Sequence, residues 1–363
     1  MRRSFRQPRE VRAMPPLRLA VDARVLAEDT RGIGRYARAV LRRLVVRDDL
    51  ALTLLIPALV PSRHRLAYAR ALGSEAFTLR RRPGARLDVI WHPANGTFVA
   101  SRLPSVATIH DAVPFRYPAS DPKRREHAQA PFLRSARTAT RFVAVSQFGR
   151  SELETWLAIP RERIAVIPHG VDPNFSPGEA QPLPAGLVAG GYFLFVGDPV
   201  AEPRKNFPLL YEGYRQAWPG GDGPALAVAG PRAPSLPGVV ALGNLGDDLV
   251  AGAGGSLRAC YRGALALTLP SYHETFGMPM LEAMASGTPV LASRASSLPE
   301  VGGDAPVYLP SDDAGAWAAA LCRIAGDADL RATLRAAGIE RAAHFDWETS
   351  ARSHLDLFRS LLR

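Results

Sequence analysis

Short, uninterrupted apolar runs recur along this chain of 363 residues, and segments with helical periodicity separate most of them. Such runs are typical of parallel strands buried on both faces, and their alternation with helices predicts doubly wound α/β sheets. In the N-terminal half we expect strands at 17–21, 52–56, 88–91, 105–109, 142–145 and 164–167. In the C-terminal half we expect strands at 192–196, 225–229, 239–242, 265–269, 289–292 and 307–309.

A stretch rich in proline and glycine separates the two sets of strands, and it is expected to be irregular. The chain is long enough for two α/β domains of ordinary size. We therefore predict a disordered basic arm over 1–13, a first domain over 14–175, a linker over 176–191, a second domain over 192–345 and a final segment over 346–363.

The composition limits the classes of partner that the protein is expected to bind. The net charge is +11, but only Lys123 and Lys205 of the 45 basic residues are lysines, a bias typical of a GC-rich genome. No zinc-finger spacing or RNP-like aromatic pattern accompanies the charge, so we expect no nucleic-acid partner. The two cysteines are too few for a disulfide framework and lack metal-ligand spacing.

No secretory signal and no long apolar span occur in the sequence, so we expect a cytoplasmic protein. A basic face could hold it peripherally at the inner membrane surface, at roughly 1 kcal/mol per well-placed charge.

The stretch 265–287 is the most informative part of the chain. Its apolar run ends at Pro270 and a turn follows, with Pro279 in the first turn of the next predicted helix and Gly287 at its end. Such a strand–turn–helix unit presents free backbone N–H groups and the positive end of the helix dipole, which suit an anion.

Two carboxylates flank this anion site, Glu274 before the helix and Glu282 inside it. Like charges repel, so these side chains suit sugar hydroxyls better than phosphate. For either glutamate alone, the favoured interpretation is a solvated surface charge. The pair in this setting favours a nucleotide-sugar pocket.

A second cationic element follows the predicted strand 192–196. Arg204 and Lys205 lie just before a predicted helix N-terminus, where the dipole and the side chains favour an anion. The alternative is a solvated basic pair. Because arginine is used almost everywhere else, the lysine here indicates a site that needs a compact ammonium group.

The segment from His273 to Val290, with its E-x7-E spacing, closely resembles the signature of retaining GT-B glycosyltransferases of family 4, the group 1 transferases. The similarity continues through 292–305 and spans residues 17–345. It implies a GT-B fold: two Rossmann-like domains facing a cleft, the first on the acceptor side and the second binding the nucleotide sugar. It also implies a C-terminal helix that crosses back to the first domain.

The resemblance assigns roles to particular residues. His110 and Asp111 match an H-D-x-x-P segment. The resemblance implies that His110 lies beside the donor sugar and that Asp111 orients the His110 ring or reaches the acceptor. Lys205 and Glu274 complete the predicted catalytic set. Donor binding is expected from these last two and from Gly32, Gly34, Arg204, Phe276, Gly277, Met278 and Glu282. Gly32 and Gly34 belong to a glycine-rich loop that we expect between the first strand and a helix that runs to Leu44.

Two departures from the family pattern are visible. Thr275 stands where glycine is usual, so its side chain must point away from the pocket. Asp198 stands where many relatives have arginine, so the second cation must come from Arg204.

The predicted reaction is retaining transfer from a nucleoside-diphosphate sugar, without a metal or another cofactor. No Asp-x-Asp of the kind that other transferases use for a divalent cation is evident. The motifs look most like bacterial mannosyltransferases that use GDP-mannose in polysaccharide synthesis, with a glycan or lipid-linked acceptor. UDP-glucose or dTDP-rhamnose donors, a GT-B-fold UDP-sugar epimerase, and a non-catalytic nucleotide-sugar-binding subunit are the alternatives.

Overall fold

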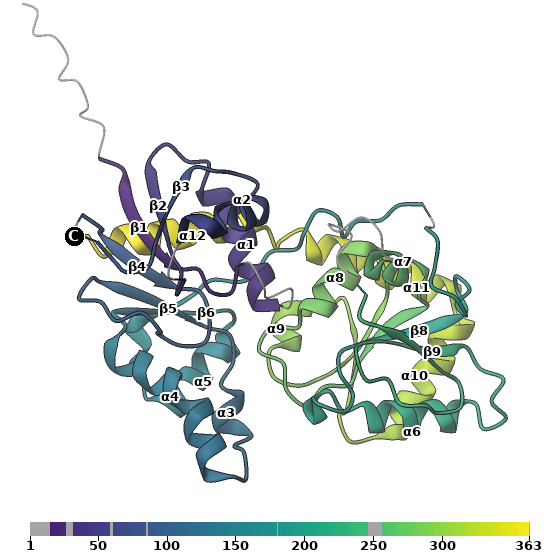
Figure 1. Cartoon of the computed structure of the whole chain (residues 1–363). Helices are drawn as coiled ribbons and strands as arrows, with labels where there is room; N and C mark the ends of the chain where they lie inside the picture. Colours follow the sequence, from purple (N-terminus) through teal and green to yellow (C-terminus); the bar gives the residue numbers. More distant parts are fainter. Residues whose placement is uncertain are drawn as a thin grey trace, which may run out of the picture.

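The chain forms two α/β lobes that lie side by side, as the computed structural model shows (Figure 1). The structure describes residues 15–26, 32–58, 61–84, 86–179, 181–245 and 256–362. The predicted basic arm over 1–13 lies outside these residues. Each lobe contains one parallel sheet, which confirms the predicted GT-B architecture.

Lobe 1 is built on a seven-stranded sheet in the order β3-β2-β1-β4-β5-β6-β7. Its short strand β3 was not predicted, because a four-residue edge strand that is only half apolar gives little periodic signal. The elements of this lobe are β1 (Leu17–Asp22), α1 (Gly32–Leu44), β2 (Leu50–Leu55), α2 (Arg65–Leu72), β3 (Phe77–Arg80), β4 (Val89–His92), β5 (Ser105–Ile109), α3 (Val113–Arg116), α4 (Pro122–Thr138), β6 (Arg141–Ala144), α5 (Gln147–Leu157) and β7 (Ile164–Val166).

Lobe 2 is built on a six-stranded sheet in the order β10-β9-β8-β11-β12-β13. Helix α7 was not predicted, because it is short and follows a glycine-rich segment. The elements of this lobe are β8 (Tyr192–Val196), η3 (Pro203–Lys205), α6 (Phe207–Ala217), β9 (Ala225–Ala229), β10 (Val239–Gly243), α7 (Leu257–Gly263), β11 (Ala266–Leu269), α8 (Met278–Ser286), β12 (Val290–Ser293), α9 (Leu298–Gly302), β13 (Val307–Leu309), α10 (Ala314–Gly326) and α11 (Ala328–Ala342).

The final helix, α12 (Trp347–Ser360), leaves lobe 2 and packs against α1 of lobe 1 (Figure 1). Trp347, Leu355 and Phe358 belong to the same apolar core as the strands of lobe 1. Close packing at the crossing needs Gly170, because a Cβ there would lie 2.3 Å from the Trp347 nitrogen. None of the described helices is both long enough and apolar enough to span a membrane.

The strand order locates two places where ligands are expected. In each sheet, consecutive strands turn away in opposite directions at one point, between β1 and β4 in lobe 1 and between β8 and β11 in lobe 2. Open parallel sheets bind ligands outside the carboxyl ends of the strands at such switch points. The loops after β8 and β11 carry the predicted residues of lobe 2.

Candidate active site

Three of the predicted residues of lobe 2, Arg204, Lys205 and Glu274, meet at its switch point. The loop after β8 ends in η3 with Lys205, and the loop after β11 carries Glu274. The Lys205 Nζ atom lies 2.8 Å from Oε1 of Glu274, and both side chains are buried. Arg204 Nη1 lies 3.6 Å from the other carboxylate oxygen, and the Ser271 hydroxyl donates to Oε1 at 2.9 Å.

These neighbours keep Glu274 ionised. Burial alone would raise the pKa of its carboxyl group, but the attraction of Lys205 and then of Arg204 outweighs it. With the hydrogen bonds from Lys205 and Ser271, the balance holds the pKa of Glu274 below its ordinary value. Two cations and one acceptor for hydroxyl protons thus lie within one buried cluster.

Lobe 1 faces this cluster through Asp111, directly after β5. Burial lowers the pKa of Arg204, but attraction to Glu274, to Glu202 and to Asp111 across the gap raises it above its ordinary value. Asp111 is held in place by lobe 1, since its oxygens accept from the Asn95 amide at 3.3 Å and the Val113 nitrogen at 3.1 Å. The structure therefore brings Asp111, Arg204, Lys205 and Glu274 into one electrostatic neighbourhood.

His110 lies deeper, in a buried group of rings. Its Nε2 donates to the Pro93 carbonyl at 2.8 Å, so this nitrogen carries the proton. The ring stacks on His169 at 5.6 Å, and His169 in turn meets the predicted donor-binding residue Phe276 at 4.7 Å. Burial, and then the nearby His110, His354 and Arg35, lower the pKa of His169, which keeps it neutral. The rings form a wall behind the site.

Glu282 belongs to a second cluster, on the α8 face that lobe 1 covers. Arg35 of α1 donates to its Oε1 at 2.5 Å, and the Tyr261 hydroxyl donates to Oε2 at 3.0 Å. Burial and the adjacent carboxylate raise the pKa of Tyr261, so its hydroxyl remains a donor. Arg35 was not predicted as a site residue, although it directly follows Gly34 in the sequence.

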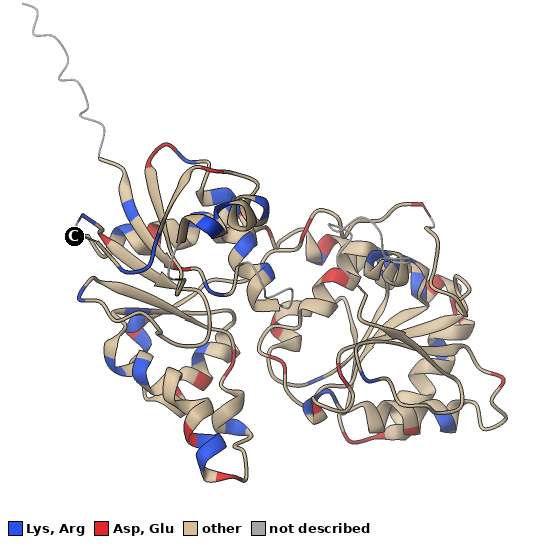
Figure 2. Ribbon diagram, in the orientation of Figure 1, with Lys and Arg blue, Asp and Glu red and all other residues tan. Residues whose placement is uncertain are grey.

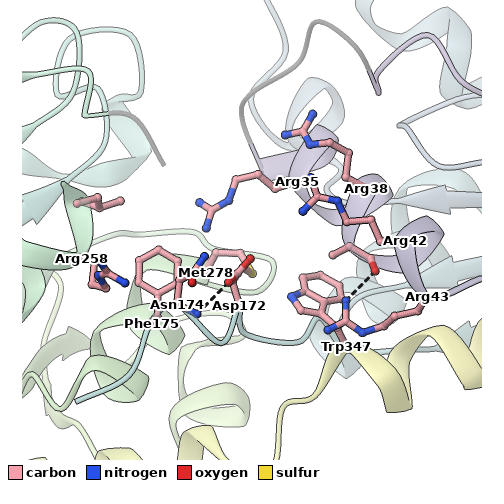
Figure 3. A pocket seen from close by; sticks show the side chains of 12 residues that line it. Arg35, Arg38, Arg42, Arg43, Asp172, Asn174, Phe175, Arg258, Met278 and Trp347 are labelled. Atoms are coloured by element: carbon pink, nitrogen blue, oxygen red, sulfur yellow. Dashed lines mark hydrogen bonds between the residues drawn. The ribbon is translucent and has the colours of Figure 1, made fainter. Parts of the chain in front are cut away.

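A cavity opens beside this second cluster, where the two lobes and the linker meet (Figure 3). Arg35 points into it from α1 towards Phe175, just before the linker, with 5.6 Å between its guanidinium and the ring. Of the predicted site residues, Met278 lines the cavity, while Lys205, Glu274 and Glu282 do not. The Lys205–Glu274 cluster and this cavity are therefore neighbouring parts of the seam between the lobes.

The glycines predicted as a loop before α1 lie inside the helix. Gly32 is its first residue, and a Cβ there would meet nothing within 4 Å. Gly34 is buried within the first turn. The expected glycine-rich loop is thus wrong for these residues, because α1 begins earlier than the sequence pattern indicated. Gly277, in contrast, needs the conformational freedom of glycine, because its φ is 86° at the N-cap of α8.

Asp198, the departure from the family pattern, has its own cation. The Arg232 guanidinium, just beyond β9, lies 2.7 Å from the Asp198 carboxylate. Burial raises the pKa of Asp198, but backbone donors at Ala201 and Val200 and the Arg232 side chain hold it below its ordinary value. An arginine, Arg232, therefore lies beside Asp198, where many relatives have an arginine in the motif itself. Because Arg232 lies 34 residues further along the chain, the motif gave no sign of it.

Three further contacts across the seam were not predicted. His273 Nε2 lies 2.9 Å from the Glu152 carboxylate of α5, and Ser146 donates its hydroxyl to the Thr275 carbonyl at 2.5 Å. The Glu300 carboxylate accepts from two backbone N–H groups at the start of α5. Ser146 also caps α5, as predicted. Nothing in a single sequence pairs residues so far apart.

The described residues hold no group of three or more His, Cys, Asp and Glu side chains arranged for a metal ion. The sequence does contain one Asp-x-Asp, Asp327-Ala328-Asp329, so the expectation that this motif is absent was wrong. Its first aspartate accepts from the Leu330 nitrogen as the N-cap of α11, a structural role.

Comparison with known proteins matches both halves of the chain. Residues 46–175 match the family described as Glycosyltransferase Family 4, and residues 190–327 match Glycosyl transferases group 1. The chain is 29% identical to O-antigen chain mannosyltransferase B of Escherichia coli over 380 residues, 91% of this chain and 96% of that protein. D-inositol 3-phosphate glycosyltransferase of Saccharomonospora viridis is 38% identical over 107 residues, 28% of this chain and 24% of its own length.

Solved structures share the fold over nearly the whole chain. Sucrose-phosphate synthase from Thermosynechococcus elongatus superposes with a TM-score of 0.65 at 19% identity, covering 95% of this chain and 99% of that one. HepE from Anabaena, in complex with UDP and glucose, gives a TM-score of 0.66 at 15% identity, covering 95% of this chain and 100% of that one. The chain belongs to the group 1, family 4 glycosyltransferases and is a glycosyltransferase with the GT-B fold.

Proposed function

We propose that this glycosyltransferase moves a hexose from a nucleoside-diphosphate sugar to a glycan or lipid-linked acceptor in polysaccharide synthesis, with retention and without a metal ion. The relative named O-antigen chain mannosyltransferase B, similar over nearly the full length, supports mannose as the transferred sugar, and we propose GDP-mannose as its donor. The solved neighbour HepE holds UDP and glucose in one structure and UDP-glucose in another, which supports a nucleotide-sugar donor in general. UDP-glucose is accordingly the first alternative donor.

The observation that carries the proposal is the buried cluster of Arg204, Lys205 and Glu274 opposite Asp111. A leaving diphosphate gains negative charge as its bond to the anomeric carbon breaks. Two preorganised cations can stabilise that charge, at roughly 3–4 kcal/mol for each well-aimed donor. Glu274, kept ionised, accepts hydrogen bonds from hydroxyls of the transferred sugar.

The step we propose balances as follows. The bond between the anomeric carbon and the diphosphate oxygen breaks, and its electron pair leaves with the diphosphate. The acceptor hydroxyl oxygen then bonds to the same face of the carbon, and its proton passes to a diphosphate oxygen. Asp111 acts as a positioning residue in this route, because both of its oxygens already accept hydrogen bonds within lobe 1. A glycosyl group captured covalently on Asp111 would contradict it.

The direct test is a donor panel of GDP-mannose, UDP-glucose and dTDP-rhamnose, assayed for donor turnover with the wild type and with Lys205→Ala and Glu282→Gln. We expect turnover of one donor and a loss of about 10²–10³ in kcat for Lys205→Ala. Lys123→Ala, at the only other lysine and exposed on α4, is the matched control. Near-normal transfer by both site variants would refute the proposal, and a C2 epimer formed without acceptor would reveal an epimerase.

A further inference from the structure

A large hollow lies in lobe 1, away from the cluster just described. It has a volume of about 1030 Å³ and opens at the carboxyl ends of β1, β2 and β3. Asp22 at the end of β1 lines it, so it adjoins the β1/β4 switch point. That volume is at the upper end of those of pockets that enclose small-molecule ligands.

The hollow exists because the connection from β4 to β5 contains no helix in the described residues 93–104. Elsewhere in a doubly wound sheet, a helix would cover this face. Here Ala20, Leu55 and Ile90 of the sheet are covered by loop residues, among them Val99 and Leu103. A loop fills the space less completely than a helix, and one wall of the hollow is therefore apolar.

Lys and Arg residues are spread over both lobes (Figure 2), and the rim of the hollow is strongly basic. Arg24, Arg81, Arg82 and Arg102 line it, against the single carboxylate of Asp22. Arg24 is already paired with Asp22 at 2.9 Å and lies over the Phe98 ring at 4.2 Å. Arg81, Arg82 and Arg102 are exposed, and none of them forms a hydrogen bond or ion pair with another described residue.

The charge of the rim is not cancelled from within. Burial raises the pKa of Asp22, but the His92 ring, whose Nδ1 lies 3.7 Å from the carboxylate, and the nearby Arg24 hold it below its ordinary value, so Asp22 balances Arg24 alone. Three arginines remain to meet an external anion. The guanidinium fork matches phosphate oxygens in pairs, which an ammonium does not.

The place of the hollow relates it to the reaction. Only β4 lies between β1, which carries Asp22, and β5, which carries His110 and Asp111 at its end. Neighbouring strands are about 4.8 Å apart, so the Asp22 end of the hollow lies on the order of 10 Å from those two residues. Arg81 and Arg82 follow β3, two strands further away, so an anion that they hold would lie on the order of 20 Å from them. A saccharide of several units bridges such a gap, and donor diphosphate is expected in lobe 2.

We propose that this hollow binds the phosphate or diphosphate group of a phosphorylated acceptor, whose sugar hydroxyl reaches Asp111. The inference rests on the proposed function, since it names the acceptor class for the same transfer. The shared chemistry is a sugar phosphate ester. Its source is either a lipid-linked sugar, whose chain lies on the apolar wall, or a soluble sugar phosphate.

The test measures binding to the full-length protein by titration calorimetry, with saturating GDP, or the nucleoside diphosphate of whichever donor is turned over, to fill the donor site. The probes are geranyl diphosphate, mannose 1-phosphate and neutral mannose. The variants are Arg81→Gln/Arg82→Gln and a matched control, Arg63→Gln/Arg70→Gln. The control removes the same charge from exposed residues of the same lobe outside the hollow.

We expect the wild type and the control to bind at least one phosphorylated probe, and the Arg81/Arg82 variant to bind it about 100-fold more weakly, roughly tenfold for each arginine. Binding of both probes indicates that the phosphate group suffices, and binding of geranyl diphosphate alone indicates a lipid-linked acceptor. The inference is overturned if the phosphorylated probes bind no more tightly than mannose. It is also overturned if the Arg81/Arg82 variant and the control variant lose affinity equally. The proposed function survives that result if GDP binding and donor turnover are unchanged, and it fails separately if no donor is used.

Discussion

Replacing Lys205 by methionine removes a buried cation but keeps the apolar stem, and the first effect falls on Glu274. Its Oε1 loses a donor at 2.8 Å and retains the Ser271 hydroxyl at 2.9 Å, while Arg204 stays 3.6 Å from Oε2. Removing one partner of a buried ion pair costs about 3–5 kcal/mol, because the other charge remains buried. With Arg204 still present, we expect the lower end, about 3 kcal/mol of unfolding free energy.

The double variant Lys205→Met/Glu274→Gln separates charge from packing. Without the carboxylate there is no uncompensated charge, so we expect its unfolding free energy to return to within about 1–2 kcal/mol of the wild type. Activity should stay low in both variants, since the diphosphate still lacks its cation. Urea unfolding followed by far-UV circular dichroism gives the differences where the slope m is unchanged, with Lys123→Met as the control.

Two results would refute this reasoning. A Lys205→Met protein within about 1 kcal/mol of the wild type would mean that Glu274 does not depend on this cation. A double variant as unstable as the single one would mean that the loss comes from packing around the stem. In the activity assay, full activity of the double variant would show that the reaction does not depend on Lys205.

Three further predictions follow from particular contacts. Because the pKa of Glu274 is depressed from 4.5, its ionised form stabilises the fold above that pH, and the stabilisation is lost as the pH falls through the folded pKa. Lys205→Met raises that pKa, so its acid unfolding curve should shift to higher pH, and superimposable curves would contradict this. Gly170→Ala should lower the free energy of unfolding by about 1–3 kcal/mol through a clash with the α12 backbone, visible as a lower thermal midpoint. Gly32→Ala should be neutral or stabilising and leave the donor KM unchanged. Glu300→Gln should weaken the contact between the lobes by about 1 kcal/mol, visible as a larger radius of gyration in X-ray scattering; an unchanged radius would argue against it.

Most of the fold was predictable from local patterns, and the exceptions have physical causes. Buried parallel strands are continuous apolar runs, so twelve of the strands could be located within a few residues, while the weakly apolar edge strand β3 escaped. The start of α1 was misplaced because glycine is read as a helix breaker, although exposed Gly32 costs little at the first position.

The candidate site was predictable only in part. Lys205 and Glu274 could be singled out from motif and composition, and the structure places them in direct contact. The partners of the neighbouring residues could not be predicted, because Arg35 lies far in sequence from Glu282, Arg232 from Asp198 and Glu152 from His273, and the fold alone brings each pair together. The roles of the predicted residues in binding and catalysis remain predictions.

The loop of Glu274 is fastened to lobe 1 on both sides of this residue. His273 is bonded to Glu152, and the Thr275 carbonyl accepts from Ser146. The lobes therefore cannot swing apart without breaking these bonds or dragging the carboxylate out of register with Lys205. Lobe separation and disassembly of the charge cluster would then be a single event, and a donor held by an open molecule would be spared from premature cleavage.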